Sequence, residues 1–280
     1  MQDNSALGRA IAVVSDLRAR CPWDRAQTRE SLRPYLVEEV LELDHALAEN
    51  DPERIRDETG DFLLHLAWQF VIAAELGEFT PAEIAGELET KMRRRHPHLY
   101  DLGPAEPWQR LKRKEGRRHL LDGLPPTLPA LQMAYRIQER AAGVGFDWPD
   151  ATGPAAKVRE ELAEVEAELA RPGALRRNSD EPGAPTLPGE ALTDEIGDLL
   201  FAVVNLARKA HVQPGVALDR ANRKFRNRFA AVEELAERRG LDLSTAGLET
   251  LDGIWDEVKA SEREKSLAPE STKAMNRGER

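Results

Sequence analysis

The sequence has a single cysteine and no apolar run long enough to cross a membrane. One cysteine, Cys21, excludes a disulfide within the chain and is typical of a reducing compartment. Residues 1–20 are too polar for a signal peptide. The apolar run 62–74 is interrupted by His65 and Gln69 and is shorter than the ~20 residues that span a bilayer. We therefore expect a cytoplasmic protein without a membrane partner.

An excess of positive charge is also lacking. Charged residues make up 32% of the chain, but the formal net charge is −10. Affinity for the phosphate backbone of nucleic acids comes from clustered lysine and arginine, so this balance argues against a general nucleic-acid binder. A small polyanion held through metal ions remains compatible with an acidic protein.

Strand patterns are missing as well, since no stretch shows a convincing alternation of apolar and polar residues at every second position. Apolar residues recur instead at helical spacing. Pro34 and Pro81 are predicted in first helical turns, Thr80 as an N-cap and Gly77 as a C-cap. We predict an all-α protein with helices over residues 34–49, 53–76, 81–95, 154–170, 190–210, 214–239 and 247–264.

The length of 280 residues suits about two domains at roughly 150 residues each. Three prolines in Gly123–Pro129 predict an interdomain linker, and the proline- and glycine-rich residues 171–189 predict an exposed irregular loop. The predicted organisation is two tandem helical domains over residues 1–122 and 130–265, the linker 123–129, and a disordered tail over 266–280.

Acidic residues at helical spacing occur twice, which supports this division. Residues 57–64 align without a gap with residues 194–201, and an acidic cluster precedes each of these segments. Carboxylates three residues apart project from one face of a helix, so two adjacent helices would bring four together. Converging carboxylates need cations between them. The carboxylates concerned are Glu39, Glu42, Glu58 and Asp61 in the first half, and Glu161, Glu164, Glu195 and Asp198 in the second.

Basic and aromatic residues follow each acidic cluster in the same order. A Lys/Arg pair and then a Trp/Lys pair are each four residues apart in both halves. Mg²⁺ prefers carboxylates and keeps substrate phosphate oxygens among its ligands, while lysine and arginine neutralise the other oxygens. The pattern thus indicates hydrolysis of a phosphoanhydride by activated water with a carboxylate as general base. These pairs are Lys91/Arg95 and Trp108/Lys112, then Lys224/Arg228 and Trp255/Lys259.

Further motifs carry a family resemblance. Together with the acidic elements, the runs Cys21–Asp24, Arg94–His98, Val144–Trp148 and Asn222–Phe225 resemble the tandem-domain MazG nucleoside triphosphate pyrophosphohydrolases over nearly the whole chain. The resemblance implies an all-α NTP pyrophosphatase fold of two helical bundles. It also implies Mg²⁺-dependent conversion of (deoxy)nucleoside triphosphates to monophosphates and pyrophosphate.

The same resemblance implies roles for individual residues. All eight carboxylates would be metal ligands, and the four basic and aromatic pairs would bind substrate. The second half is the expected main site, with Glu161, Glu195 and Lys224 in catalysis. Which glutamate is the general base, which phosphorus is attacked, how many metals bind, and whether the first half turns over are left open.

Other readings remain in play. A related hydrolase could act on a narrower substrate, because the carboxylates recognise phosphates and metal rather than the base. Alternatively, the helices could form a non-catalytic nucleotide-binding or dimerisation scaffold. We also expect a homodimer, because a small helical unit must cover its apolar residues. Those residues are Phe62, Leu63, Leu66, Phe70, Leu199, Leu200 and Val203.

Overall fold

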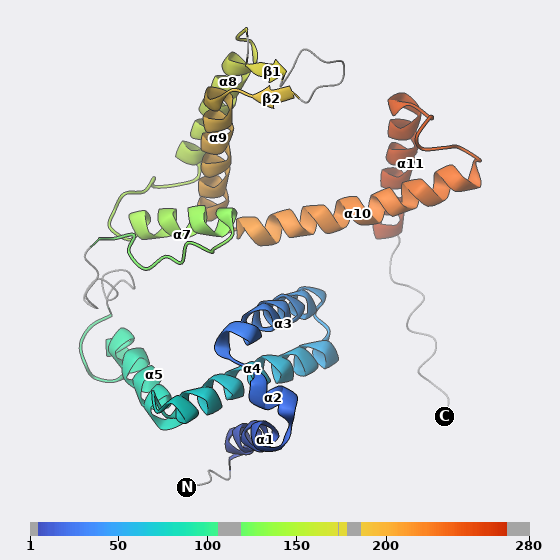
Figure 1. Cartoon of the computed structure of the whole chain (residues 1–280). Coiled ribbons are helices and arrows are strands. Elements are labelled where there is room, and N and C mark those ends of the chain that lie inside the picture. The colour runs from blue at the N-terminus through green and yellow to red at the C-terminus, as the bar shows by residue number, and fades with distance from the viewer. Residues whose placement is uncertain (1–4, 106–118, 173, 178–185, 268–280) are drawn as a thin grey trace. The chain divides into compact units, whose positions relative to one another are not determined.

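The computed structural model describes residues 5–105, 119–172, 174–177 and 186–267 (Figure 1). The first unit contains α1 (Ala6–Arg20), α2 (Pro22–Ala26), α3 (Arg29–Glu49), α4 (Pro52–Leu76), α5 (Pro81–Arg95) and the 3₁₀ helix η1 (Pro97–Leu99). The second contains α7 (Ala130–Ala142), α8 (Thr152–Leu169), β1 (Leu175–Arg177), β2 (Thr186–Pro188), α9 (Glu190–Lys209), α10 (Pro214–Arg238) and α11 (Leu248–Leu267).

The chain divides into two compact units, Met1–Glu106 and Pro107–Arg280. This boundary falls before the predicted linker at 123–129. The Arg140 guanidinium of α7 donates to the carbonyls of Leu120 and Asp122, at 3.2 and 2.7 Å, so this stretch is attached to the second unit. The predicted domain limits stay a prediction, and most of the predicted tail lies outside the described residues.

The all-α fold class is confirmed. A small difference occurs in the segment 171–189, which was predicted to be irregular. Here β1 and β2 form a two-stranded antiparallel sheet in which Leu175 faces Pro188 and Arg177 faces Thr186. Strands of three residues are too short for a period-two pattern to be visible in the sequence.

Local chemistry explains where the helices begin and end. The Thr80 hydroxyl and the Glu83 carboxylate form a capping box at the start of α5, with Pro81 at its first position. Gly77 ends α4 with φ 66°, the left-handed conformation that glycine adopts without strain. These predictions are confirmed. The predicted start of a helix at Pro34 is wrong, because Thr28 caps α3 and the helix begins at Arg29.

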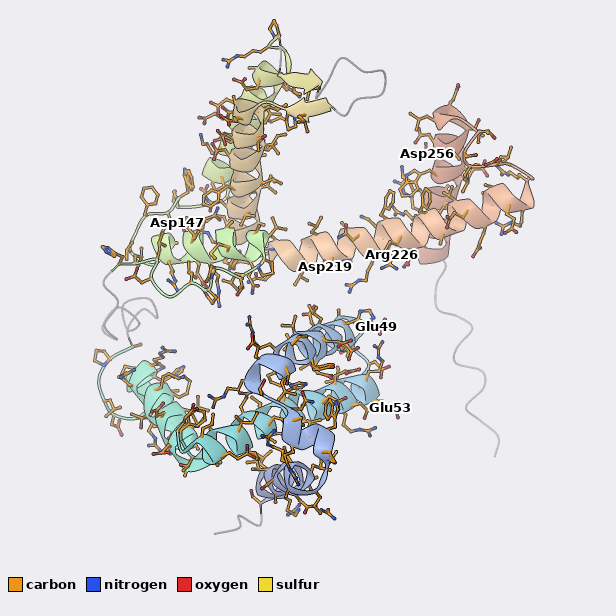
Figure 2. The ribbon with its side chains drawn as sticks, viewed as in Figure 1. Glu49, Glu53, Asp147, Asp219, Arg226 and Asp256 are labelled. Atoms are coloured by element: carbon orange, nitrogen blue, oxygen red, sulfur yellow. The ribbon has the colours of Figure 1, made fainter. Side chains whose placement is uncertain are left out.

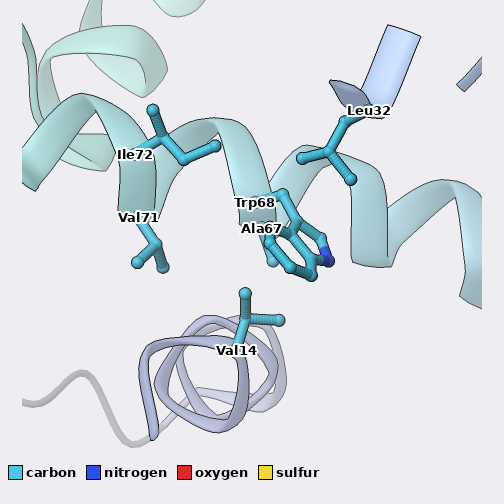
Figure 3. Close-up of a cluster of buried hydrophobic side chains, with 6 residues drawn as sticks. All are labelled: Val14, Leu32, Ala67, Trp68, Val71 and Ile72. Carbon is cyan, nitrogen blue, oxygen red and sulfur yellow. The ribbon is translucent and has the colours of Figure 1, made fainter. Parts of the chain in front are cut away.

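The core of the first unit lies between α1, α3 and α4. Figure 3 shows Val14 of α1 opposite Trp68 of α4, with Leu32 of α3 on the other side of the indole. Arg18 reinforces this packing, since its guanidinium pairs with Glu75 at 2.6 Å. The sequence analysis missed α1, although Ser5 caps it and its apolar residues have helical spacing.

The second unit is built around the antiparallel pair α8 and α9, against which α7 packs. The sequence analysis did not predict α7. This helix is attached to α9 by Gln138, whose side chain donates a hydrogen bond to the carbonyl of Phe201 at 2.8 Å. Farther along the chain, Val232 and Ala236 of α10 pack on Ile254 and Val258 of α11 in a separate apolar cluster.

The described helices differ in length and hydropathy, the two properties that decide whether a helix can cross a bilayer. No single one is long and apolar enough to cross a bilayer. Only α4 and α5 taken together reach that composition, and they are bent by 117° at the break between them.

Candidate functional site

The first acidic cluster lies on the antiparallel pair α3 and α4. Asn50, with φ 55°, ends α3, and the Asp51 carboxylate caps the start of α4, so the chain reverses within two residues. This reversal brings Glu39 of α3 beside Glu58 and Asp61 of α4. One carboxylate oxygen from each of the three lies within 4.8 Å of the others. In the described part of the chain, the fourth predicted ligand, Glu42, is not within this set.

Crowding of negative charge changes the protonation of this cluster. Burial raises the pKa of Glu39 above its ordinary value, and the charges of Asp61, Glu42 and Glu58 raise it further. One turn after Asp61, His65 is 5% exposed and its Nδ1 atom has no hydrogen-bond partner. Desolvation lowers the pKa of His65 more than the nearby Asp61 raises it. The imidazole is therefore a neutral neighbour of the cluster.

The second acidic cluster repeats the arrangement on α8 and α9. Glu161 and Glu164 of α8 and Glu195 of α9 each offer an oxygen within 4.8 Å of the others. Asp198, one turn beyond Glu195, is not within this set among the described residues. Glu161 is the deepest of the three, at 5% exposed. Both halves thus contain three converging carboxylates from two antiparallel helices.

Lys157 is a residue of this cluster that the sequence analysis missed. Its Nζ atom lies 2.5 Å from Glu161 and 2.9 Å from Glu160. The hydrogen bond from Lys157 lowers the pKa of Glu161, whereas a hydrogen bond to Glu161 raises the pKa of Glu164. The sequence signal was the lysine four residues before a predicted ligand on one helix.

The basic residues of the second half gather on α10 and α11. Arg228 Nε donates to Glu262 at 2.8 Å, and the guanidinium lies 5.9 Å from the Trp255 ring centroid. Lys224 and Glu262 line an open cavity of about 480 Å³. Lys259 lies one turn after Trp255 and pairs with Asp256 at 2.9 Å. The structure therefore brings Lys224, Arg228 and Trp255 into one neighbourhood.

The acidic and basic residues of the second half lie on different parts of that unit. Among the described elements, α11 packs chiefly on α10, whereas α8 packs chiefly on α9. Figure 1 shows α11 at the end of α10 remote from α7, α8 and α9.

In the first half, too, the basic residues lie on a different helix from the carboxylates. Lys91 and Arg95 lie on α5, a helix that buries none of its side chains. Trp108 and Lys112, the other predicted binding pair, lie outside the described residues.

The donor chemistry of each acidic cluster suits a hard divalent cation. Carboxylate oxygens are the ligands that Mg²⁺ and Ca²⁺ take in proteins, and Mg²⁺ binds through few carboxylates together with waters and phosphates. Three converging carboxylates also repel one another, as the raised pKa values of Glu39 and Glu164 indicate. A cation would relieve that repulsion, so these residues fit a metal that carries a phosphate substrate.

Comparison with known proteins gives consistent matches. Residues 27–100 match the family model of the MazG nucleotide pyrophosphohydrolase domain. The chain is 40% identical over 260 residues to the nucleoside triphosphate pyrophosphohydrolase/pyrophosphatase MazG of Thermotoga maritima, covering 90% of this chain and 95% of that protein. It is 37% identical over 270 residues to the nucleoside triphosphate pyrophosphohydrolase of Escherichia coli K12, covering 91% and 98%. An uncharacterized protein of Bacillus subtilis, YabN, is 37% identical over 264 residues, which are 90% of this chain and 51% of that protein.

Proposed function

Since this chain belongs to the MazG family of nucleoside triphosphate pyrophosphohydrolases, we propose that it converts nucleoside triphosphates to monophosphates and pyrophosphate with Mg²⁺. The chain is a hydrolase that acts on phosphoanhydride bonds. The observation that carries the metal-dependent mechanism is the set of three carboxylates within 4.8 Å, found once in each half. The single cysteine supports a reducing compartment, and we place the activity in the cytoplasm.

In the proposed main site, Glu161, Glu164 and Glu195 would hold the ion, with Asp198 as a fourth ligand. When bound, Mg²⁺ supplies Lewis acidity to water and to phosphate oxygens. A carboxylate of this set takes the proton from the attacking water.

The basic residues bind the phosphates. Lys224, Arg228 and Lys259 would neutralise oxygens that the metal does not reach. Lys224 is exposed, whereas Arg228 and Lys259 are half-buried and pair with Glu262 and Asp256. Trp255 offers an aromatic face to the base. Because the pKa of Glu164 is raised above its ordinary value, metal binding to this site should weaken as the pH falls.

The first half is proposed as a second, weaker site. Its ligands would be Glu39, Glu42, Glu58 and Asp61, and its substrate-binding residues Lys91, Arg95, Trp108 and Lys112. The second half is favoured because its Lys/Arg pair and Trp255 lie together in the structure.

Substitution of one ligand in each half tests this assignment. Glu195→Gln keeps the size of the side chain but removes its charge, so we expect kcat for monophosphate formation to fall by ~100-fold or more. Glu58→Gln should lower it by less than ~10-fold. The control is Glu166→Gln, an exposed glutamate of α8 outside the cluster, which should leave kcat unchanged.

The measurement is the rate of monophosphate release, with helix content followed by circular dichroism. Equal losses from Glu195→Gln and Glu58→Gln would defeat the assignment of the main site to the second half.

A further inference from the structure

The row of basic residues on α10 extends beyond the proposed phosphate-binding pair. Arg220 lies one turn before Lys224, which lies one turn before Arg228. Arg223 comes three residues after Arg220 and so projects from the same side of the helix. The segment 220–228 holds five basic residues and no acidic residue, in a chain of net charge −10. Arg220 and Arg223, the additional arginines, therefore continue the positive charge by one turn toward the start of α10.

One cavity gathers the additional arginines with the proposed phosphate-binding lysine. Arg220, Arg223 and Lys224 line the open cavity of about 480 Å³. Glu262 of α11 also lines it, but this carboxylate already accepts a hydrogen bond from Arg228 Nε at 2.8 Å. Within the described residues, the three cations that line the cavity have no hydrogen-bond or ion-pair partner. Since like charges three and four residues apart on a helix repel one another, an anion in this cavity would stabilise the segment.

The internal repeat shows that the first half lacks the additional arginines. When Lys91 is aligned with Lys224, the additional arginines correspond to Glu87 and Thr90. The Lys/Arg pair that both halves share is the part of the row that the proposed function assigns to a triphosphate. The additional arginines are therefore available for a group that a triphosphate does not have.

The order of side chains along α10 indicates what that group is. The Arg228 guanidinium lies 5.9 Å from the ring centroid of Trp255, which is the proposed partner of the base. Arg220 lies eight residues before Arg228, roughly 12 Å away along the axis at 1.5 Å per residue. A phosphate chain that runs along α10 from the base would thus meet Arg228, then Lys224, and the additional arginines last. Guanidinium groups bind phosphate oxygens with paired hydrogen bonds, so these arginines suit an outermost phosphate.

We propose that the additional arginines form a subsite for a fourth phosphate, so that the second half also accepts nucleoside 5′-tetraphosphates. The inference rests on the proposed function for the cleavage itself. Water is added across the same bridge between the first and second phosphates, and the products are the monophosphate and tripolyphosphate. No co-reactant other than water is consumed.

Hydrolysis of adenosine 5′-tetraphosphate and of ATP in Mg²⁺ tests the subsite. Arg220→Gln/Arg223→Gln removes two phosphate contacts, so kcat/KM should fall by ~10-fold or more for the tetraphosphate and by less than ~2-fold for ATP. The matched control is Arg226→Gln/Arg238→Gln, which removes the same charge from exposed positions of α10 that are not among the described residues lining the cavity. Figure 2 labels Arg226. The control should change kcat/KM for both substrates by the same small factor.

Three results of this experiment would overturn the proposal. The first is an equal loss for ATP and the tetraphosphate in Arg220→Gln/Arg223→Gln. The second is a tetraphosphate loss of the same size in the control variant, because general attraction by positive charge would then explain the effect. The third is a wild type that hydrolyses ATP but not the tetraphosphate.

Binding of inorganic polyphosphates tests the subsite without catalysis. Tripolyphosphate is the product expected from the tetraphosphate, and pyrophosphate is the product expected from ATP. In EDTA, calorimetry should show that wild type binds tripolyphosphate ~10-fold more tightly than pyrophosphate, and Arg220→Gln/Arg223→Gln should remove this difference. If the difference is found but no nucleotide is hydrolysed, the proposed function fails and the subsite stands. Hydrolysis of ATP by a wild type that binds the two polyphosphates equally would reject the subsite alone.

Discussion

Glu161 and Glu164 lie one turn apart on α8, yet their pKa values shift in opposite directions. The ammonium of Lys157 lowers the pKa of Glu161, while the hydrogen bond with Glu161 and the charge of Glu195 raise the pKa of Glu164. Glu164 therefore takes up a proton more readily than Glu161 as the pH falls. In the first half, burial and neighbouring carboxylates raise the pKa of Glu39 in a similar way.

The raised pKa values of Glu39 and Glu164 predict that metal binding depends on pH. A cation binds the deprotonated carboxylates, so Mg²⁺ affinity should fall as the pH drops through the raised pKa values of Glu39 and Glu164, beginning above the ordinary glutamate value of 4.5. Calorimetry in buffers of different ionisation enthalpy measures the protons released. We expect proton release on Mg²⁺ binding at acidic pH that diminishes as the pH rises.

Removing one carboxylate of the pair gives the control. Glu164→Gln should abolish the proton release of the second cluster and leave that of the first. Mg²⁺ affinity that does not fall as the pH is lowered would contradict the raised pKa values of Glu39 and Glu164.

Residue spacing was sufficient to predict most of the two clusters. Glu39 with Glu58, and Glu161 with Glu195, were expected to converge because each pair comes from adjacent helices. Spacing could not decide which face of each helix turns inward, so the displacement of Glu42 and Asp198 from the three-oxygen sets was not foreseen. The role of Lys157 was missed because a lysine one turn from a glutamate is common on exposed helices.

At the scale of elements, the loop Val144–Asp150 is fixed to the end of α9. Arg208 donates to the Asp147 carboxylate at 3.1 Å, and the Lys209 ammonium lies 3.3 Å from it. Figure 2 shows Asp147 in the loop that follows α7. Beyond it, the Trp148 ring lies so close to Gly153 that a Cβ there would meet the ring at 2.1 Å. The start of α8, and with it Glu161, depends on this loop.

Asp147→Asn should therefore destabilise the second unit by about 2 kcal/mol, because it leaves the largely buried Arg208 guanidinium without its carboxylate. Arg208 chiefly, and Lys209, hold the pKa of Asp147 below its ordinary 3.8. Stability from such a lowered pKa is present above 3.8 and lost as the pH falls through the folded-state value. The difference between variant and wild type should thus be constant at neutral pH and shrink only in strong acid.

Urea denaturation at several pH values measures this difference. The matched control is Glu234→Gln, whose exposed pair with Arg238 at 3.8 Å contributes little. An Asp147→Asn effect as small as that of the control would contradict the anchoring of the loop.

Element types were more predictable than their limits. Long amphipathic segments such as α9 and α10 follow directly from apolar spacing. The helix α7 was missed although its apolar Met133, Ala134 and Ile137 are at helical spacing; its buried side chains are the polar Gln138 and Arg140. The start of α3 was misplaced because a proline was taken as the first-turn signal, whereas the Thr28 and Ser31 capping box decides it.

At the scale of the whole molecule, apolar surface remains exposed on the described part of one chain. Ile196, Leu200 and Val203 lie along one face of α9 and are 41%, 53% and 43% exposed. Contiguous apolar surface of this kind marks a protein interface. We therefore retain the homodimer as a proposal and expect α9 to contribute to its contact.

Leu200→Glu should weaken the dimer by ~10-fold or more, since it places a charge in the centre of that stripe. Sedimentation of wild type should give twice 31.3 kDa, and the variant should approach 31.3 kDa with unchanged helix content. The control is Leu187→Glu in β2, similarly exposed at 48%, which should stay dimeric. A monomeric wild type would contradict the proposal.

The direction in which α10 leaves α9 could not be predicted from the sequence. It depends on four connecting residues and on the left-handed conformation of His211, an uncommon state for a residue other than glycine. Internal repetition predicted that both halves carry the same residue types. It could not predict that the basic residues lie on α10 and α11, apart from the carboxylates of α8 and α9.

Product analysis tests the central proposal most directly. Nucleoside triphosphates and deoxynucleoside triphosphates are incubated with the wild-type protein in Mg²⁺ and in EDTA, and all phosphate products are separated. We expect monophosphate and pyrophosphate in equal amounts with Mg²⁺, and neither in EDTA. Orthophosphate with diphosphate would mean that a different bond is cut, and equal release in EDTA would contradict a metal held by the carboxylate clusters.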